Sequence, residues 1–236
     1  MAIGPKTAAV AYVYGPKMAG AIPLERVVEI AHARGVPVIV DAAAMLPPVE
    51  NLTRYVAAGA DMVSFSGGKG VLGPQSTGIL CGRKALIEAA YMNSAPNSEG
   101  VGRPAKVTKE EIAGIITALE IFVDTDQEVQ RADWRNKCQV IVSGLEGIAG
   151  VTTTLVEARP ELQDSRSGHA TAIVRPDTLV TGLTDDDVIA RLKEGNPPIY
   201  VGSAGPEGGI AIVPVNLRDG EAEIVTERLR GILAGS

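Results

Sequence analysis

An aspartate and a lysine are the residues of this sequence whose types and spacing most suggest chemistry. Asp41 follows the apolar run 36–40, and Lys69 lies in the glycine-rich segment 66–70, directly after the run 61–65. Both runs are short and mostly apolar, as expected of buried strands. The two residues are 28 positions apart, about one strand–helix–strand step. Because open α/β sheets bind ligands at the carboxyl ends of their strands, we expect both side chains to face one ligand.

A lysine amine together with a carboxylate is the pair that pyridoxal phosphate requires. The amine forms an imine with the cofactor, and the carboxylate keeps its pyridine nitrogen protonated. Taken singly, each residue has a simpler interpretation, because Asp41 could be a turn residue and Lys69 a solvated lysine between glycines. A Walker-type loop is excluded, since segment 67–70 lacks the upstream glycine and the following Ser or Thr. Ser66 and the amides of Gly67 and Gly68 remain candidates for holding a phosphate.

The surrounding pattern alternates strands and helices. It predicts an α/β fold with a mostly parallel sheet, built from strands near 8–14, 36–40, 61–65 and 77–81 and helices near 24–34, 51–58 and after 84. A long helical region, 109–123 continuing or restarting through 129–145, follows. Strands at 151–156, 170–174 and 210–213, a helix capped by Thr184 and a last helix at 221–233 indicate a small α+β domain. We therefore place the domains at 1–125 and 126–236.

Composition narrows the possible partners. The 236 residues carry a net charge of −6 without basic clusters, which argues against a nucleic-acid partner. The apolar stretch 36–46 is interrupted and too short to span a membrane. The two cysteines are far apart and the histidines are only two, so no metal site is expected and a thiol-reduced, cytoplasmic protein is the plain interpretation. His32, within the first predicted helix, is interpreted as structural.

Several segments resemble one group of pyridoxal-phosphate enzymes. They are residues 40–48 (VDAAAMLPP), 59–70 (GADMVSFSGGKG) and 73–78 (GPQSTG), with further likeness at 102–112 and 194–199. The group is the selenocysteine-synthase-like branch of the aspartate-aminotransferase fold (fold type I), which includes D-glucosaminate-6-phosphate ammonia-lyase. The resemblance covers essentially the whole chain. It implies that residues 1–125 are the C-terminal part of the large, cofactor-binding domain.

The resemblance also implies roles for individual residues. Lys69 resembles the Schiff-base lysine, Asp41 the partner of the pyridine nitrogen, and Ala43 the small residue packed against the ring. Ser66 and Gly68 belong to the segment that lies at the cofactor's phosphate side.

Two further residues carry weaker expectations. Gln75 lies in a loop that faces the neighbouring subunit's site in relatives. Arg103 is a candidate for binding an anionic substrate group, because a guanidinium grips carboxylate or phosphate through two hydrogen bonds. A solvated loop arginine is an equally good interpretation of Arg103.

The resemblance favours β-elimination from an amino acid or amino-sugar acid. Aminotransferase or selenium-transfer activity is the alternative, and the acidic chain argues against a tRNA substrate. Family members usually carry a further N-terminal portion that this sequence does not show. Its absence would uncover a sheet edge, so we expect a homodimer or higher oligomer. A second alternative is a catalytically impaired or truncated protein of the same fold that acts as a subunit or scaffold. A generic α/β domain that binds another phosphate ligand is disfavoured by the specific motifs.

Overall fold

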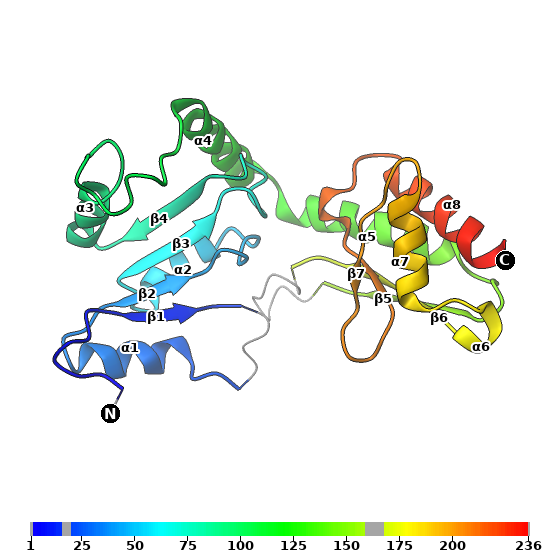
Figure 1. Ribbon diagram of the computed structural model, residues 1–236, viewed down its shortest axis with the longest axis horizontal. Helices are drawn as coiled ribbons and strands as arrows, with labels where there is room; N and C mark the ends of the chain where they lie inside the picture. The colour runs from blue at the N-terminus through cyan, green and yellow to red at the C-terminus, as the bar shows by residue number, and fades with distance from the viewer. Residues whose placement is uncertain (1, 16–19, 159–167, 236) are drawn as a thin grey trace. The chain divides into compact units, whose positions relative to one another are not determined.

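A computed structural model describes residues 2–15, 20–158 and 168–235, and within it the chain divides between Thr125 and Asp126 into two compact units (Figure 1). Each unit has its own cluster of buried side chains. The division falls inside the long helical region, which consists of α4 (Lys109–Asp124) and α5 (Gln127–Gly144). Thr125 is extended and Asp126 caps α5 by accepting hydrogen bonds from two backbone amides, so the helix restarts there.

The first unit is built on a four-stranded sheet of order β1-β2-β3-β4. Its strands are β1 (Val10–Val13), β2 (Val38–Asp41), β3 (Met62–Ser66) and β4 (Gly78–Gly82). The first three are parallel, which confirms the mostly parallel sheet, whereas β4 runs antiparallel to β3. The loop 67–77 joins β3 to β4 without a crossover helix, and such a direct connection returns the chain in the opposite direction.

The helices of this unit are α1 (Leu24–His32), α2 (Asn51–Ala57), α3 (Lys84–Met92) and α4. The sheet buries one face strongly, because Val38, Val40, Val63 and Phe65 are almost completely inaccessible. The alternate residues of β2 and β3 are less buried, as the two-residue period of a strand requires. Asp41 belongs to this second, more open face.

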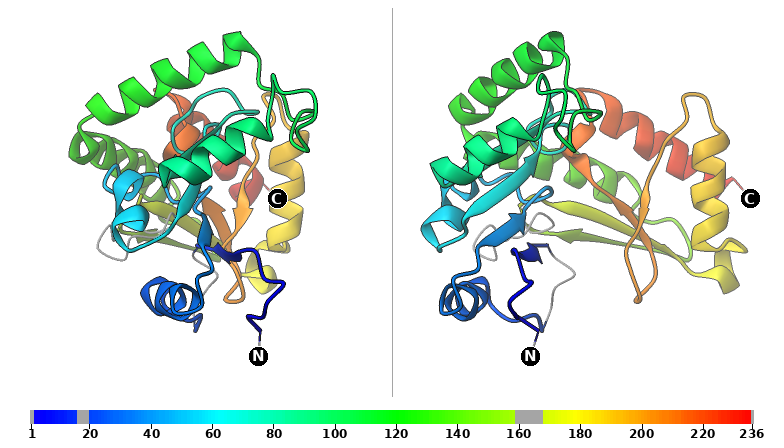
Figure 2. Two further views of the ribbon diagram at one scale, coloured as in Figure 1. Left: turned by 90° about the vertical axis from the view of Figure 1, so that its left-hand side faces the viewer. Right: turned by 60° about the vertical axis from the view of Figure 1, so that its left-hand side comes forward.

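The second unit pairs an antiparallel sheet of order β5-β6-β8-β7 with helices (Figure 2). Its elements are β5 (Val151–Val156), β6 (Thr171–Pro176), α6 (Thr178–Thr181), α7 (Asp185–Glu194), β7 (Gly202–Ser203), β8 (Ile210–Ile212), a 3-10 helix (Pro214–Asn216) and α8 (Glu221–Ala234). The three predicted strands are present, and Thr184 caps α7 as expected, in a capping box with Asp187. The short α6 and β7 were not predicted. The core lies between the sheet and the helices α5, α7 and α8.

Among the helices described, none has both the length and the apolar character needed to cross a membrane.

Candidate cofactor site

Two neighbouring strands bring the predicted site residues to one edge of the first sheet. Asp41 is the last residue of β2 and Ser66 the last of β3, and the strands are parallel. Beyond β2, the Ala42 amide donates to the Ser64 carbonyl (2.9 Å) and the Ser66 amide to the Ala43 carbonyl (3.4 Å). The chain leaving β2 therefore runs along the end of β3, and Asp41, Ala43 and Ser66 lie together.

Lys69 begins a tight turn just after this edge. The Leu72 amide donates to the Lys69 carbonyl at 2.9 Å, and the Gly73 amide to the Gly67 carbonyl at 2.8 Å. Leu72 takes the left-handed conformation that closes the turn, with φ 58°. The Lys69 side chain is exposed, and its Nζ has no hydrogen bond or ion pair to the residues that the structure describes.

The two glycines before Lys69 are required by close packing. A Cβ atom at Gly68 would lie 2.6 Å from the Gln75 Cα, and one at Gly67 would collide with the side chain of Thr77. The Gln75 side chain donates from Nε2 to the Gly68 carbonyl at 3.0 Å. Gln75 is therefore held beside the backbone that carries Lys69.

One expectation about this segment is wrong. The Gly67 amide donates to the Thr77 carbonyl at 2.9 Å, so it is already used and cannot also hold a phosphate. Which backbone amides of a tight loop remain without a hydrogen bond depends on how the loop folds back on itself, and the sequence does not reveal this. The Gly68 amide has no backbone partner within the described ranges, so it and the Ser66 hydroxyl remain the phosphate candidates.

Asp41 is an exposed carboxylate with one oxygen engaged. Its Oδ1 accepts a hydrogen bond from the Ala43 amide at 2.9 Å, as a turn residue at a strand end does. Its Oδ2 makes no hydrogen bond or ion pair with the described part of the chain. The turn role and the cofactor role are therefore compatible, because the second oxygen can still accept from a pyridinium N–H.

Arg103 is not joined to this edge. It lies in the loop between α3 and α4, where its amide donates to the Gly100 carbonyl at 3.0 Å. The side chain is partly buried, and its guanidinium has no hydrogen bond or ion pair to any described residue. Its role in substrate binding stays a prediction.

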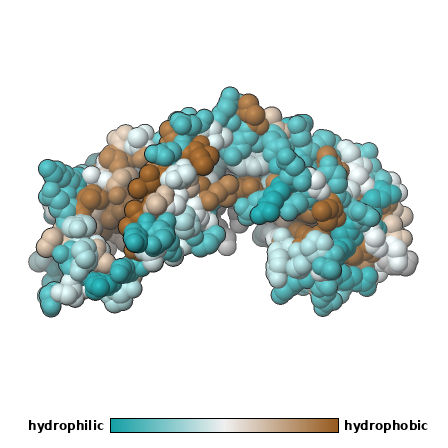
Figure 3. Space-filling model, turned by 90° about the horizontal axis from the view of Figure 1, so that it is seen from above, coloured by the Kyte–Doolittle hydropathy of each residue, from teal (hydrophilic) through white to brown (hydrophobic). Residues whose placement is uncertain are grey.

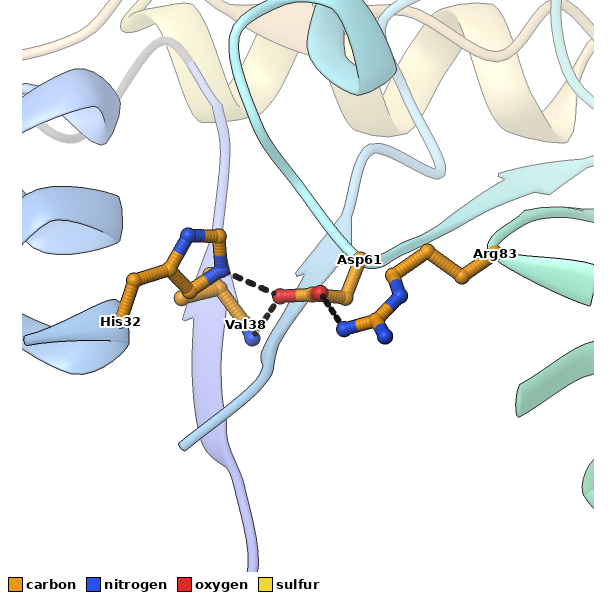
Figure 4. A network of polar contacts seen from close by, with 4 residues as sticks. All are labelled: His32, Val38, Asp61 and Arg83. Atoms are coloured by element: carbon orange, nitrogen blue, oxygen red, sulfur yellow. Dashed lines mark hydrogen bonds and ion pairs between the residues drawn. The ribbon is translucent and has the colours of Figure 1, made fainter. Parts of the chain in front are cut away.

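A buried carboxylate at the opposite edge of the sheet was missed by sequence reasoning. Asp61, 2% exposed, accepts hydrogen bonds from the Val38 amide (2.8 Å), His32 Nε2 (2.7 Å) and the Arg83 guanidinium (2.9 Å) (Figure 4). Burial raises the pKa of Asp61, but these hydrogen bonds outweigh it, and the net pKa lies below its ordinary value. The signal in the sequence was an acidic residue directly before a buried strand. His32 takes part in this network, away from the cofactor edge.

The residues at the cofactor edge fit pyridoxal phosphate. An exposed amine, a carboxylate with a free oxygen and the small Ala43 lie around the ends of β2 and β3. Ser66 and the Gly68 amide offer donors for an anion.

The sequence profile of the Aminotransferase class-V family matches residues 1–162. The chain belongs to this family. Class-V aminotransferases and their ammonia-lyase homologues depend on pyridoxal phosphate, which confirms the cofactor expected from the sequence.

Individual relatives agree with this class-V assignment. A D-glucosaminate-6-phosphate ammonia lyase from Salmonella typhimurium is 31% identical over 98% of this chain and 58% of its own length. A 5'-C-glycyluridine monooxygenase-decarboxylase from Streptomyces sp is 30% identical over 98% of this chain and 56% of its own length. A selenium transferase acting on L-seryl-tRNA(Sec), from Rhizobium meliloti, is 33% identical over 55% of the chain.

Solved structures confirm the fold. A D-glucosaminate-6-phosphate ammonia-lyase matches with a TM-score of 0.77 at 30% identity, over 99% of this class-V chain and 59% of the solved one. A ureidoglycine–glyoxylate aminotransferase from Bacillus subtilis matches with a TM-score of 0.59 at 15% identity. The chain thus has the fold of type I pyridoxal-phosphate enzymes and spans somewhat over half the length of the relatives that it matches.

Proposed function

We propose that this chain is a pyridoxal-phosphate enzyme of the lyase type, which removes a β-substituent and then ammonia from an amino acid or amino-sugar acid. The observation that carries the proposal is the meeting of Asp41 and the Lys69 loop at the carboxyl ends of two neighbouring parallel strands. The likeness to the solved ammonia-lyase, which extends over both units, supports elimination over transfer.

Bound pyridoxal phosphate supplies an electron sink for the carbon that carries the substrate's amine. Lys69 would hold the cofactor covalently, and its Nζ would accept the proton from that carbon. Asp41 would keep the ring nitrogen protonated through Oδ2. Ala43 would leave room for the ring, and the Ser66 hydroxyl and the Gly68 amide would bind the phosphate.

The proposed substrate class, an amino acid or amino-sugar acid, rests on the resemblance to the ammonia-lyase. Two relatives of nearly equal identity carry the names of different reactions, so sequence identity alone does not decide which reaction this chain performs. We assign Arg103 to an anionic group of an amino-acid-like substrate and Gln75 to the neighbouring subunit's site. We further propose that the protein is cytoplasmic, that it forms a homo-oligomer and that it has no nucleic-acid partner.

The first test is covalent labelling. The purified chain with added pyridoxal phosphate should develop an imine absorbance band, and borohydride reduction followed by peptide mapping should place the adduct on Lys69. Lys69→Ala should abolish the band, whereas Lys84→Ala should retain it, because Lys84 is an exposed lysine at the start of α3. An adduct on another lysine, or an unchanged band in Lys69→Ala, would overturn the site.

The second test separates the reaction types. D-glucosaminate-6-phosphate, the substrate named for one relative, would be incubated with the loaded protein, and released ammonia measured. Elimination followed by hydrolysis predicts ammonia and a 2-oxo acid without any amino acceptor. Product that forms only when a 2-oxo acid acceptor is supplied would instead establish a transferase.

A further inference from the structure

The loop 67–77, which carries Lys69 and which we call the Lys69 loop, is closed by its own backbone. Its ends are joined, because the Gly67 amide donates to the Thr77 carbonyl at 2.9 Å. Inside it, the Gly73 amide donates to the Gly67 carbonyl at 2.8 Å. Compact loops whose ends meet in this way behave as units. The position of Lys69 therefore depends on the surface against which the whole loop packs.

That surface is one side of α4. Figure 3 looks down on the side where α4 lies and shows apolar surface on this unit. A Cβ atom at Gly73 would lie 2.8 Å from Ile115 Cδ1, and one at Gly114 would lie 2.8 Å from Pro74 Cγ. Ile115 is buried in the core of the first unit, which fixes the helix at this point. Glycines on both partners thus let the Lys69 loop pack closely on an anchored helix.

One side-chain hydrogen bond adds direction to this apolar contact. The Ser76 hydroxyl donates to Oε1 of Glu111, and within the described residues no other hydrogen bond joins the Lys69 loop to α4. Glu111 lies four residues before Ile115, so the two side chains are on the same side of the helix. The apolar contact sets how closely the loop approaches the helix, and the hydrogen bond sets where along the helix it rests.

The Glu111 carboxylate is itself held by the first turn of α4. Its Oε2 accepts from the Thr108 amide at 2.9 Å, and the Glu111 amide donates to the Thr108 hydroxyl at 3.2 Å, which makes a capping box. A capping box uses one carboxylate oxygen, and here the second oxygen accepts from Ser76. The hydrogen bonds from Ser76 and Thr108 hold the pKa of Glu111 below its ordinary value, so the carboxylate is charged at neutral pH.

We infer that Glu111 is a positioning residue of the cofactor site, which holds the Lys69 loop in place through its hydrogen bond to Ser76. The role is indirect, because both carboxylate oxygens are already used within the chain. The Lys69 Nζ has no partner among the described residues, so the loop alone sets its place. The inference rests on the proposed function in one respect, namely that Lys69 is the lysine that binds pyridoxal phosphate.

The first readout needs no cofactor. Hydrogen–deuterium exchange of the unloaded full chain, followed on the peptide that contains the Gly67 and Gly73 amides, measures how often the loop opens. Ser76→Ala removes the bond to Glu111 and leaves the capping box intact, so this peptide should exchange about fivefold faster. Thr108→Val is the matched control. It removes the hydroxyl of the cap but not the Ser76 bond, so it should lower the melting temperature without changing exchange in the loop.

The second readout is the imine band that forms with added pyridoxal phosphate. Ser76→Ala should raise the cofactor concentration needed for half-maximal absorbance by about fivefold, and Glu111→Ala by at least as much. The double variant S76A/E111A should be no worse than Glu111→Ala, because the two residues act through one bond. Glu111→Gln should keep both readouts near those of the parent chain, since an amide can accept from the Thr108 amide and donate to the Ser76 oxygen.

The two readouts together separate the possible failures. Unchanged exchange in Ser76→Ala would overturn the inference, because the bond would then not hold the loop. Faster exchange with an unchanged half-maximal cofactor concentration would also overturn it, because the bond would then serve the fold alone. A parent chain that forms no imine on Lys69 would overturn the proposed function and the positioning role with it, whereas the effect of Ser76→Ala on exchange would persist.

Discussion

Gly68 shows how one residue constrains the backbone of its neighbour, Lys69. Its missing side chain lets the Gln75 backbone approach, and its carbonyl accepts a hydrogen bond from the side-chain Nε2 of Gln75. The glycine-rich segment is therefore a packing requirement of the loop as well as a chemical signature.

Gly68→Ala should consequently lower the free energy of unfolding by about 1–3 kcal/mol, the usual range for forced overpacking. It should also weaken cofactor binding, since the Lys69 turn must shift. Urea unfolding and titration with pyridoxal phosphate measure the two effects. Gly4→Ala is the matched control, because nothing lies within 4 Å of the added Cβ. A Gly68→Ala chain with unaltered stability would show that the loop adapts freely.

Asp61 is a buried carboxylate of the first unit, so its ionisation contributes to the stability of that unit. Asp61→Asn should cost about 1–3 kcal/mol at neutral pH, because a buried carboxylate loses its charge-assisted hydrogen bonds. The expected loss of stability is modest, because the Arg83 and His32 side chains are 68% and 44% exposed and solvent screens their interaction with Asp61. Glu88→Gln, which alters an exposed 3.9 Å pair, should change stability little and serves as the control.

The pH dependence of this effect has a defined sign. The folded pKa of Asp61 is lowered relative to an unfolded value of about 3.9. Its contribution is therefore fully present above pH of about 4 and is lost as the pH falls through the folded pKa. The stability difference between the parent chain and Asp61→Asn, measured by urea unfolding, should shrink below pH of about 4. A difference that stays constant to pH 3 would contradict the assignment.

At the scale of elements, two helices of the second unit differ in how much space lies beside a glycine. Gly231 in α8 has nothing within 4 Å of an added Cβ, whereas a Cβ at Gly144, the last residue of α5, would strike the Thr226 methyl group. The α5–α8 contact thus depends on a glycine, and the free side of α8 does not.

Gly231→Ala should raise the free energy of unfolding by up to about 1 kcal/mol, because alanine loses less backbone entropy in a helix. Gly144→Ala should lower it by about 1–3 kcal/mol through overpacking. Thermal unfolding followed by circular dichroism compares the two in one background. Equal effects of the two substitutions would mean that the α5–α8 contact is not close-packed.

At the scale of the whole molecule, the two units are expected to be separate folding domains. The second unit has a continuous core of its own, in which Ile141, Val174, Leu192 and Leu229 are almost completely buried. We predict that residues 126–236 expressed alone unfold cooperatively and bind no pyridoxal phosphate. Calorimetry and absorbance test both points. A gradual transition without a heat-absorption peak would mean that this part needs the first unit to fold.

The sequence by itself determined most of the helices and strands, and it placed Asp41 and the Lys69 segment at the ends of two of the strands. Apolar runs bounded by glycine and proline locate β1 to β3, and the ends of two of them locate Asp41 and the Lys69 segment. These signals are local, because a short apolar run between turn residues marks a strand whatever its partners are. The capping of α7 by Thr184 was visible for the same reason.

Only the tertiary structure decided which polar groups of distant segments form hydrogen bonds with one another. The direction of β4, the capture of the Gly67 amide by Thr77 and the binding of Asp61 by His32 and Arg83 were not predicted. Each depends on partners brought together by packing, whose identity a local pattern does not encode. A backbone amide or a carboxylate looks the same in sequence whether its partner is solvent, a ligand or another strand, and only the folded chain assigns that partner.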